Sequence, residues 1–168
     1  DELKRTLEPR AASPSARLRA IRKLSEAGVP VIVMASPIIP FINDSELESI
    51  LEAGREAGAT AASYIAVRLP NEVAPLFRQW LDDHAPLKAD HVMSLIQQMR
   101  GGKDNDPRFF TRHRGEGPYA QLLAKRYQIA CKRLGFQYTN SMRLTLDTSQ
   151  FRVPLRPLFD EGPQRELF

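Results

Sequence analysis

The sequence predicts an α/β fold of the barrel type, with buried parallel strands in its first half and a helical region in its second. Two nearly continuous apolar runs, residues 29–35 and 61–67, are typical of strands buried on both faces of a parallel sheet. Helical periodicity before and between them gives the order helix–strand–helix–strand, which right-handed crossovers produce in parallel sheets. Beyond residue 84 the apolar spacing is almost entirely helical.

Local signals indicate where the first helices begin and end. Ser13 is placed to cap a helix that has Pro14 at its first position, and Gly28 suits the left-handed residue after its last turn. Asn43 and Glu46 have the spacing of a capping box for a second helix, which lies between the two strands. Both strands are therefore expected to be joined by a helical crossover.

The second half is predicted as a helical extension that ends in a tail. Helices are expected after Asn71, at 89–99 and at 118–134, and a short strand at 142–146. Prolines and charges from residue 152 onward predict a flexible tail. We divide the chain into the βα units of residues 1–84, a helical extension with a basic loop over 85–151, and the tail over 152–168.

The composition is that of one globular domain of 168 residues with a cytoplasmic location. The net charge of +4 permits nucleic-acid or phosphate partners without requiring them. We expect no membrane contact, because no apolar run approaches the roughly 18 residues that span a bilayer. A lone cysteine, Cys131, excludes an internal disulfide and cannot hold an iron–sulfur cluster or a structural zinc. The three histidines show no metal-ligand spacing, so no metal site is predicted within the chain.

The chain is predicted to be a piece of a longer protein. A two-stranded parallel sheet has two open edges and is not stable by itself. The first residues, DELKRTLEPR, are charged and do not begin with Met. We therefore expect the missing N-terminal half of the same protein to lie beside the strands.

Residues 36–43 form the first candidate binding segment. Ligands of parallel α/β folds bind at the carboxyl ends of the strands, which is where this proline-rich loop is expected. In one interpretation Ser36, Pro37 and Ile39 form a stiff wall against an aromatic or heterocyclic ligand. In the other, the apolar side chains of the loop plug the mouth of the barrel, and spacing alone favours this plug.

Glu8, Arg10 and Arg68 are expected on the same rim. Glu8 and Arg10 precede the first helix, and Arg68 follows the second strand. A carboxylate suits ribose hydroxyls and a guanidinium suits bidentate binding of a carboxylate. Surface ion pairs would explain each residue as well, but their positions on consecutive strand ends favour a shared cofactor site.

Residues 103–118 form a basic loop that mixes cations with aromatic side chains, as nucleic-acid-binding loops do. Three acidic residues in the same loop lower its local charge, so a structural role stays open. The predicted nucleic-acid-binding residues are Lys103, Arg108, Arg112 and Arg114.

The last five residues, QRELF, resemble the short motif with which bacterial repair and replication proteins bind the sliding clamp. Gln164, Leu167 and Phe168 have the required order, a glutamine followed by two apolar residues. A short peptide of this kind binds in a groove when it lies at a free end. The sliding clamp is therefore a candidate partner.

Longer stretches, in order along residues 2–135, carry a family resemblance. They are LEPRAASPSARLRAIRKLSEAGVPVIVMASPIIPFIND, YIAVRLP, HVMSLIQQMRGG, DPRF and RGEGPYAQLLAKR. This series resembles the bacterial radical SAM proteins of the spore-photoproduct-lyase-like group, which are described as DNA repair photolyases.

The resemblance implies the C-terminal part of a partial, TIM-like (β/α) barrel. Such an enzyme binds S-adenosylmethionine and a [4Fe–4S] cluster, and generates a 5′-deoxyadenosyl radical that abstracts hydrogen from its substrate. The family holds its cluster on a CxxxCxxC loop, which this sequence lacks. The resemblance thus implies that the cluster ligands lie upstream and that this fragment alone is inactive.

Matching positions extend the resemblance to single residues. Glu8 and Arg10 match a plausible S-adenosylmethionine-contacting edge, Ser36 to Ile39 match the loop that backs the cofactor, and Arg68 matches the end of the next strand. Phe41 departs from the pattern, in which Gly tends to precede Asn-Asp, and a Phe there could narrow the pocket.

Three hypotheses for the function follow from the residues and the resemblance together. The leading one is a radical SAM enzyme, lyase-like, that acts on DNA or RNA in a repair role. The second is a non-catalytic module that binds a partner or a nucleic acid through the basic loop and the tail. The third is a radical SAM enzyme for a small molecule or peptide, with the basic residues incidental.

Overall fold

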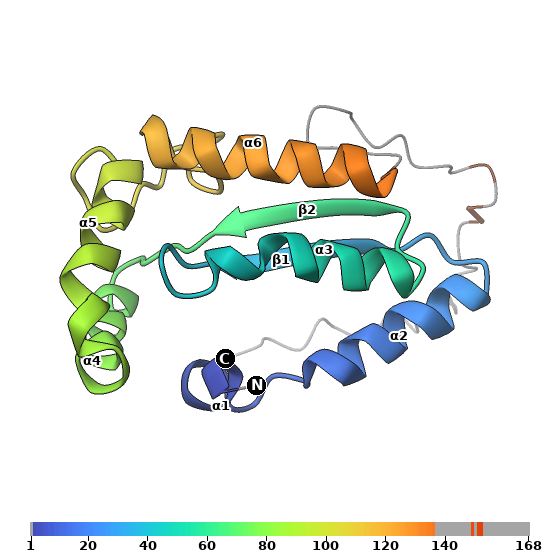
Figure 1. The fold of residues 1–168 in the computed structure, drawn as a ribbon, viewed down its shortest axis with the longest axis horizontal. Helices are drawn as coiled ribbons and strands as arrows, with labels where there is room; N and C mark the ends of the chain where they lie inside the picture. The colour runs from blue at the N-terminus through green and yellow to red at the C-terminus, as the bar shows by residue number, and fades with distance from the viewer. Residues whose placement is uncertain (1, 137–148, 150, 153–168) are drawn as a thin grey trace, which may run out of the picture.

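The computed structural model describes residues 2–136, 149 and 151–152, which form a mixed α/β fold (Figure 1). The predicted strand at 142–146 and nearly all of the predicted tail, with Gln164, Leu167 and Phe168, lie outside the described residues. In chain order the elements are α1 (Glu2–Leu7), α2 (Pro14–Glu26), β1 (Ile32–Ile38), the 3-10 helix η1 (Asp44–Glu46), α3 (Leu47–Glu56), β2 (Ala61–Ala66), α4 (Val73–His84), the 3-10 helix η2 (Pro86–Lys88), α5 (Ala89–Met99) and α6 (Gly117–Leu134).

The two strands form a parallel pair, as predicted. Ile32 lies opposite Ala61 and Ala35 lies opposite Tyr64, with a shift in register before Ile38. Helix α3 makes the crossover between the strands, and α4 and α5 stand at their carboxyl ends (Figure 1). The described residues thus confirm the parallel α/β arrangement, and their two strands do not close a barrel.

The predicted position of the first strand was wrong by three residues. It was expected at 29–35 and lies at Ile32–Ile38, so Ser36 and Pro37 belong to the strand and not to the loop. The reason is the turn at Gly28, which has φ 77°, after which residues 29–31 serve as a connection. Pairing with the second strand begins only where the carbonyl of Val31 accepts the amides of Thr60 and Ala61.

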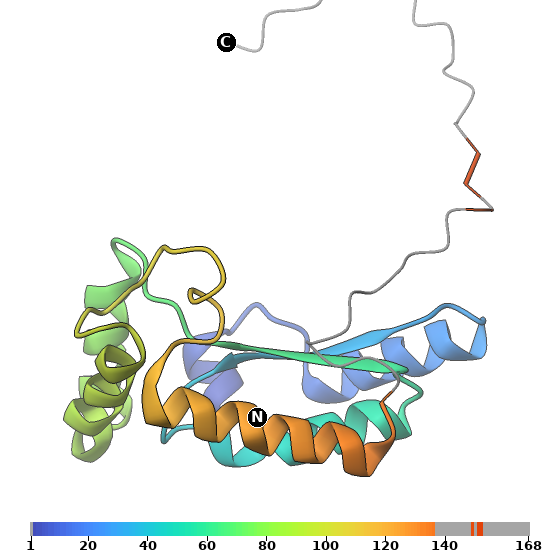
Figure 2. The same cartoon turned by 90° about the horizontal axis from the view of Figure 1, so that it is seen from above.

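Burial on both faces is confirmed for β2 and wrong for β1. In β2 every residue is buried or half-buried, whereas β1 alternates strictly over its first half. Ile32 is 45% exposed and Met34 is 54% exposed, while Val33 and Ala35 are buried. The alternation in β1 arises because α3 and α6 both lie on one face of the sheet, and no helix of the described residues covers the other (Figure 2).

The predicted helix ends are partly confirmed. The hydroxyl of Ser13 accepts a hydrogen bond from the amide of Ala16 at 3.3 Å, as an N-cap does. Asn71 does not cap α4, which begins two residues later at Val73. Instead, Asn71 takes the left-handed conformation, with φ 46°, in the turn before the helix. A short polar side chain tolerates that conformation better than most residues.

The core has two parts that meet at the carboxyl ends of the strands. One packs α3 and α6 onto the sheet and includes Leu47, Leu51 and Leu123. The other packs α4 and α5 against the segments that leave the strands, through Ile39 and Leu69 among others. Truncating one of these fully buried leucines to alanine would cost about 2–5 kcal/mol of folding free energy. Over the described part of the chain, every helix is too short or too polar to cross a membrane.

Candidate functional site

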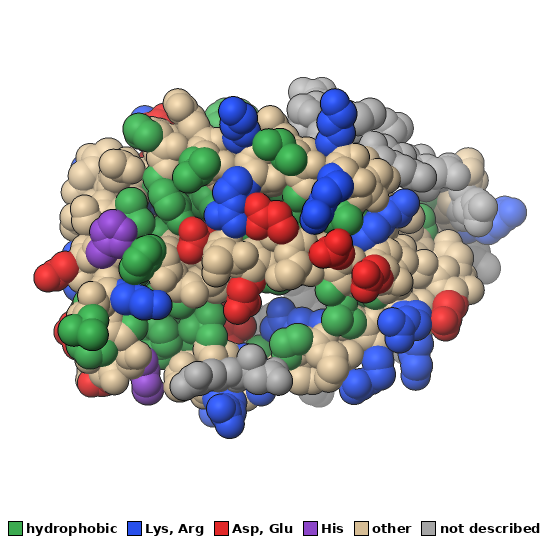
Figure 3. Space-filling model, viewed as in Figure 1, with side chains coloured by type: hydrophobic (Ala, Val, Ile, Leu, Met, Phe, Trp, Pro, Cys, Tyr) green, Lys and Arg blue, Asp and Glu red, His purple; other side chains and the backbone are tan. Residues whose placement is uncertain are grey.

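An apolar cleft of about 450 Å³ runs along the open edge of β1. Its walls are α1 and α2 on one side and β1 with the first turns of α3 on the other. Figure 3 shows the hollow between α3 and the two N-terminal helices, with hydrophobic side chains along it. Helix α2 has no buried residue of its own, so its apolar side chains, including Leu18 and Ile21, are available to the cleft.

The cleft brings together four of the six residues predicted to bind a cofactor. Glu8, Ser36, Pro37 and Ile39 all line it. Glu8 lies 3.7 Å from the guanidinium of Arg17, another residue of the lining, and both side chains are about half exposed. The carboxylate at this end of the cleft is therefore only loosely paired and accessible to a ligand.

Arg10 and Arg68 do not line the cleft. Arg10 is exposed in the turn that follows α1. Arg68 is half-buried after β2, and its Nε is buried without a hydrogen-bond partner among the described residues. Burial first, and then the charges of Arg112 and Arg68, lower the pKa of His113, so Arg68 lies within electrostatic reach of the basic loop. The structure thus groups Arg68 with the predicted nucleic-acid-binding residues.

Asn43 closes the loop that ends the cleft, a role that the sequence did not predict. Its side-chain oxygen accepts the amide of Ile39 at 2.7 Å, and its side-chain nitrogen donates to the carbonyl of Pro37 at 3.0 Å. Asn43 makes no side-chain capping bond to the helix that follows, so its prediction as an N-cap was wrong. These two bonds fix the two wall residues of the cleft in place.

Phe41 does not narrow the cleft. It is not part of the lining, and its ring packs edge-on against His91 with centroids 4.7 Å apart. The ammonium of Lys88 lies 5.5 Å from the same ring. A φ of 60° at Phe41 turns the chain so that this side chain points toward the second core cluster and solvent.

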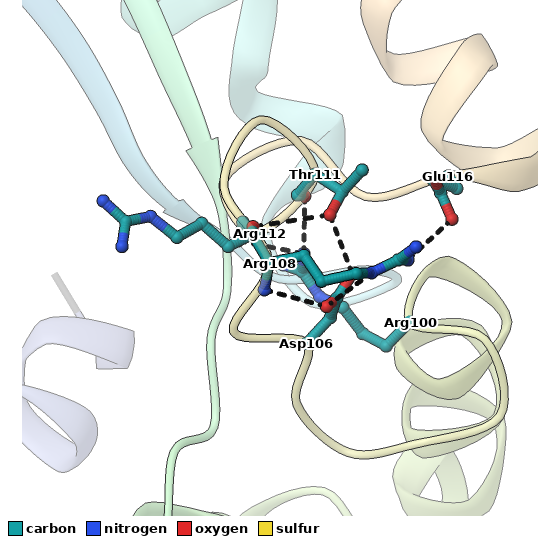
Figure 4. A network of polar contacts seen from close by, with 6 residues as sticks. All are labelled: Arg100, Asp106, Arg108, Thr111, Arg112 and Glu116. Carbon is teal, nitrogen blue, oxygen red and sulfur yellow. Dashed lines mark hydrogen bonds and ion pairs between the residues drawn. The ribbon is translucent and has the colours of Figure 1, made fainter.

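The basic loop is held by a polar network around Asp106 (Figure 4). Arg108 donates to both carboxylate oxygens of Asp106, at 3.0 and 2.9 Å, and also to Glu116 at 3.0 Å. Thr111 donates to Asp106 at 2.8 Å. Hydrogen bonds from the Arg108 side chain, and then from its backbone amide, hold the pKa of Asp106 well below its usual range. Arg108 is thus paired with two carboxylates.

Arg100, which the sequence did not single out, closes the base of this loop. Its side chain is 2% exposed and donates to the carbonyls of Thr111, Arg112 and Val67 at 2.8–3.0 Å, and to that of Ala66 at 3.5 Å. Burial lowers the pKa of this guanidinium, while the charge of Asp106 opposes the shift. Helical spacing at 89–99 gave no signal for it, since Arg100 comes just after the last helical turn.

The rest of the loop presents aromatic and cationic groups to solvent. Phe110 is 97% exposed and Phe109 is 71% exposed. The guanidinium of Arg112 lies 4.3 Å from the Phe109 ring, and Figure 4 shows this side chain pointing away from the Asp106 network. Of the four predicted nucleic-acid-binding residues, Lys103 is exposed and Arg112 is half-buried with no ion pair among the described residues. Arg108 is exposed but paired, and Arg114 packs against Tyr64.

The described residues contain no group of three His, Cys, Asp or Glu side chains that could hold a metal ion. Cys131 is buried in the core, and burial raises the pKa of its thiol. A buried thiol of this kind is a poor metal ligand, because the thiolate is the form that binds.

Comparisons with known proteins give a short and uninformative match. The chain is similar to proteins described as uncharacterized from Mycobacterium bovis and from two strains of Mycobacterium tuberculosis. In each case 82 residues align at 33% identity, which is 48% of this chain and 24% of the relative. The chain thus spans about a quarter of the length of the curated relatives that it matches. No family model and no solved structure matches it.

Proposed function

We propose that this chain is the C-terminal, cofactor-facing part of a radical SAM enzyme that acts on nucleic acid. The observation that carries the proposal is the cleft, in which Glu8, Ser36, Pro37 and Ile39 come together at the end of a parallel strand. Cofactors of parallel α/β enzymes bind at that end of the strands. The proposed function therefore follows from the position of these residues at the strand end, together with the sequence resemblance.

The cleft also supports a partial barrel. The cleft follows the unpaired edge of β1, and its walls are apolar side chains from both sides of that strand. One more parallel strand, paired with the first half of β1, would satisfy the open backbone edge there. The carboxyl end of β1, with Ser36, Pro37 and Ile39, would stay open to the cofactor. We propose that the N-terminal half of the same protein supplies this strand.

The residues present fit S-adenosylmethionine better than they fit an iron–sulfur cluster. The apolar wall at Pro37 and Ile39 suits a purine, and the Glu8 carboxylate suits ribose hydroxyls or a sulfonium charge. S-adenosylmethionine would supply the 5′-deoxyadenosyl group when bound, and this chain's residues would orient it and exclude water. No cluster fits the described residues, since their one thiol, Cys131, is buried, and we derive no step through it.

Binding of S-adenosylmethionine to the full chain, measured by isothermal titration calorimetry, tests the cofactor site. Glu8→Gln should weaken binding by roughly tenfold, which is about the value of one charge-assisted hydrogen bond. The matched control is Glu26→Gln, which removes the same charge from an exposed position outside the cleft. Absence of saturable binding, or equal losses in both variants, would contradict the proposal.

A nucleic-acid substrate is supported by the exposed aromatic rings of the basic loop. Phe109 and Phe110 face solvent, and Arg112 lies over the first of them. Exposed rings that alternate with cations are the arrangement on which unpaired bases stack while phosphates are neutralised. A repair-type substrate, with a base out of its stack, would meet both requirements.

Fluorescence anisotropy with a single-stranded oligonucleotide compares two arginines of the same loop. Arg112→Gln should weaken binding severalfold and flatten the salt dependence, because a free phosphate contact is lost. Arg108→Gln should change affinity less, because Asp106 and Glu116 already neutralise that guanidinium. Equal effects would mean that only net charge matters, and a flat salt response in the parent chain would exclude this interface.

A second candidate is a radical SAM enzyme for a small molecule or peptide. It is favoured by one observation, the internal pairing of Arg108 and the packing of Arg114, which leave fewer free cations on the loop than the sequence predicted. A flat salt response together with intact S-adenosylmethionine binding is the outcome expected from this candidate.

A further inference from the structure

A second cavity, of about 580 Å³, lies at the opposite edge of the sheet from the cleft. It is bounded by β2, by the end of the basic loop and by the first turns of α6. The lining shares no residue with the cleft beside β1. Its chemistry is set by Tyr64, Arg114, Glu116, Gly117, Gln121 and Tyr127.

Arg114 lines this cavity and carries an unpaired guanidinium nitrogen. Its Cζ lies 3.8 Å from the centroid of the Tyr64 ring and 5.6 Å from that of Tyr127, so the aromatic rings hold the group in place. One terminal nitrogen makes a long contact with the hydroxyl of Ser63, at 3.4 Å. The other is buried and has no hydrogen-bond partner among the described residues. Its free N–H donors suit an anionic acceptor.

Tyr64 adds a second buried donor without a partner. The residue is 1% exposed, and its hydroxyl is buried with no hydrogen-bond partner in the described part of the chain. Its neighbour Tyr127, whose ring lies 4.9 Å away, donates to the carbonyl of Ala62 at 2.7 Å and is satisfied. A buried hydroxyl left unpaired costs about 1–3 kcal/mol, which a ligand acceptor would recover.

The N-terminus of α6 is the third feature of the wall. This 18-residue helix begins at Gly117 without a side-chain cap, and Gly117 is part of the cavity lining, so the positive end of the helix dipole borders one end of the cavity. Glu116 lies on the same wall, but its charge is opposed by Arg108 at 3.0 Å. The cavity therefore has two buried donors and a helix N-terminus, and its one lining carboxylate is already paired.

We propose that this cavity binds a phosphate group, held by Arg114 and Tyr64 at the N-terminus of α6. Several separate donors suit phosphate, which offers more acceptor oxygens than a carboxylate. The phosphate would belong either to a small phosphate ester or to a nucleic-acid backbone. The site stands independently of the cofactor cleft, since it lies at the other edge of the sheet.

Calorimetric titration of the full chain with inorganic phosphate, at constant ionic strength, tests the site. Arg114→Gln should weaken binding by about tenfold and Tyr64→Phe by about threefold to tenfold. Arg133→Gln is the matched control, because it removes the same charge from an exposed position of α6 outside the cavity, and it should change affinity by less than about twofold. Tyr127→Phe, which leaves both free donors intact, should likewise retain binding.

Several outcomes would overturn the proposal. They are no saturable phosphate binding, acetate binding as tight as phosphate, or an Arg133→Gln loss equal to that of Arg114→Gln. If Arg114→Gln does not fold, Tyr64→Phe decides, since it keeps the ring and removes only the hydroxyl. Displacement of phosphate by a short single-stranded oligonucleotide would support the site and assign it to a nucleic-acid backbone. Displacement by adenosine 5′-monophosphate alone would support the site and assign it to a small ester.

Discussion

The two edges of the sheet have opposite surroundings. At the end of β2, polar groups of the following loop satisfy the backbone: His113 accepts the amide of Ala66 at 2.9 Å, and Arg100 binds the carbonyls of Ala66 and Val67. Along β1, the edge opens onto an apolar cleft whose far wall is a helix that buries none of its own residues. The carboxyl end of β2 is closed by the side chain of Arg100 and the backbone of the loop, whereas the edge of β1 is left open among apolar side chains.

In these two regions, the cationic and the apolar residues have roles different from those that the sequence suggested. Two of the four cations that the basic loop offered as ligand contacts are engaged within the protein, Arg108 with carboxylates and Arg114 with tyrosine rings. The apolar residues Ile32 and Met34 of β1, which resembled ordinary core, are instead exposed and line an accessible cleft. In this chain an arginine near a strand end can therefore stabilise the fold through internal contacts as readily as it can contact a ligand.

Replacement of Arg100 by methionine is expected to have the largest effect on stability. Methionine keeps much of the volume and removes every donor, so the buried carbonyls of the loop and of β2 lose their partners. Each unpaired buried group costs about 1–3 kcal/mol, so we expect the free energy of unfolding to fall by about 3 kcal/mol or more. Urea denaturation of the full chain measures this change.

The control for Arg100 is an exposed arginine that is also bonded. Arg78 pairs with Asp104 at 2.8 Å, but its side chain is 44% exposed, so Arg78→Met should cost less than about 1 kcal/mol. Similar losses in the two variants would show that the edge of β2 is not closed by Arg100. Phosphate or oligonucleotide binding that disappears with Arg100→Met while stability is unchanged would also contradict the structural role.

The fold could be predicted from the sequence wherever apolar spacing is regular. Residues 89–99 and 118–134 gave their helices to within a residue, because burial of one face determines a helix directly. The first strand was misplaced, because an apolar run has no internal mark for where pairing begins. The point at which pairing begins is set by the partner strand, so the register of the first strand could not be predicted from residues 29–35 alone.

The sequence predicted those residues of the candidate site that lie together at the end of a strand. It missed the roles of residues that act through tertiary contacts. Ser36, Pro37 and Ile39 are consecutive or nearly so, and they line the cleft together with Glu8. Arg100 and Asn43 were missed because their partners are backbone carbonyls and amides, which leave no trace in side-chain composition. A polar residue just beyond a helix or strand is the available signal, and it is a weak one.

A smaller effect distinguishes the two faces of β1. A Cβ added at Gly54 of α3 would lie 2.7–2.9 Å from three side-chain atoms of Val33, on the helix-covered face. Overpacking of this kind costs about 1–3 kcal/mol, against a gain in helix propensity of up to about 1 kcal/mol. Gly54→Ala should therefore lower the free energy of unfolding by about 1 kcal/mol.

On the opposite face, Met34→Ala should change the free energy of unfolding by no more than about 0.5 kcal/mol, because that side chain is 54% exposed. A double-mutant cycle sharpens the test, since Val33→Ala removes the two γ carbons that the new methyl group meets and leaves only the Cβ, at 2.8 Å. Gly54→Ala should therefore cost less in the Val33→Ala background. Additive losses would contradict the close approach of α3 to β1. A cost at Met34 as large as that at Gly54 would mean that the face of β1 turned away from α3 and α6 is packed.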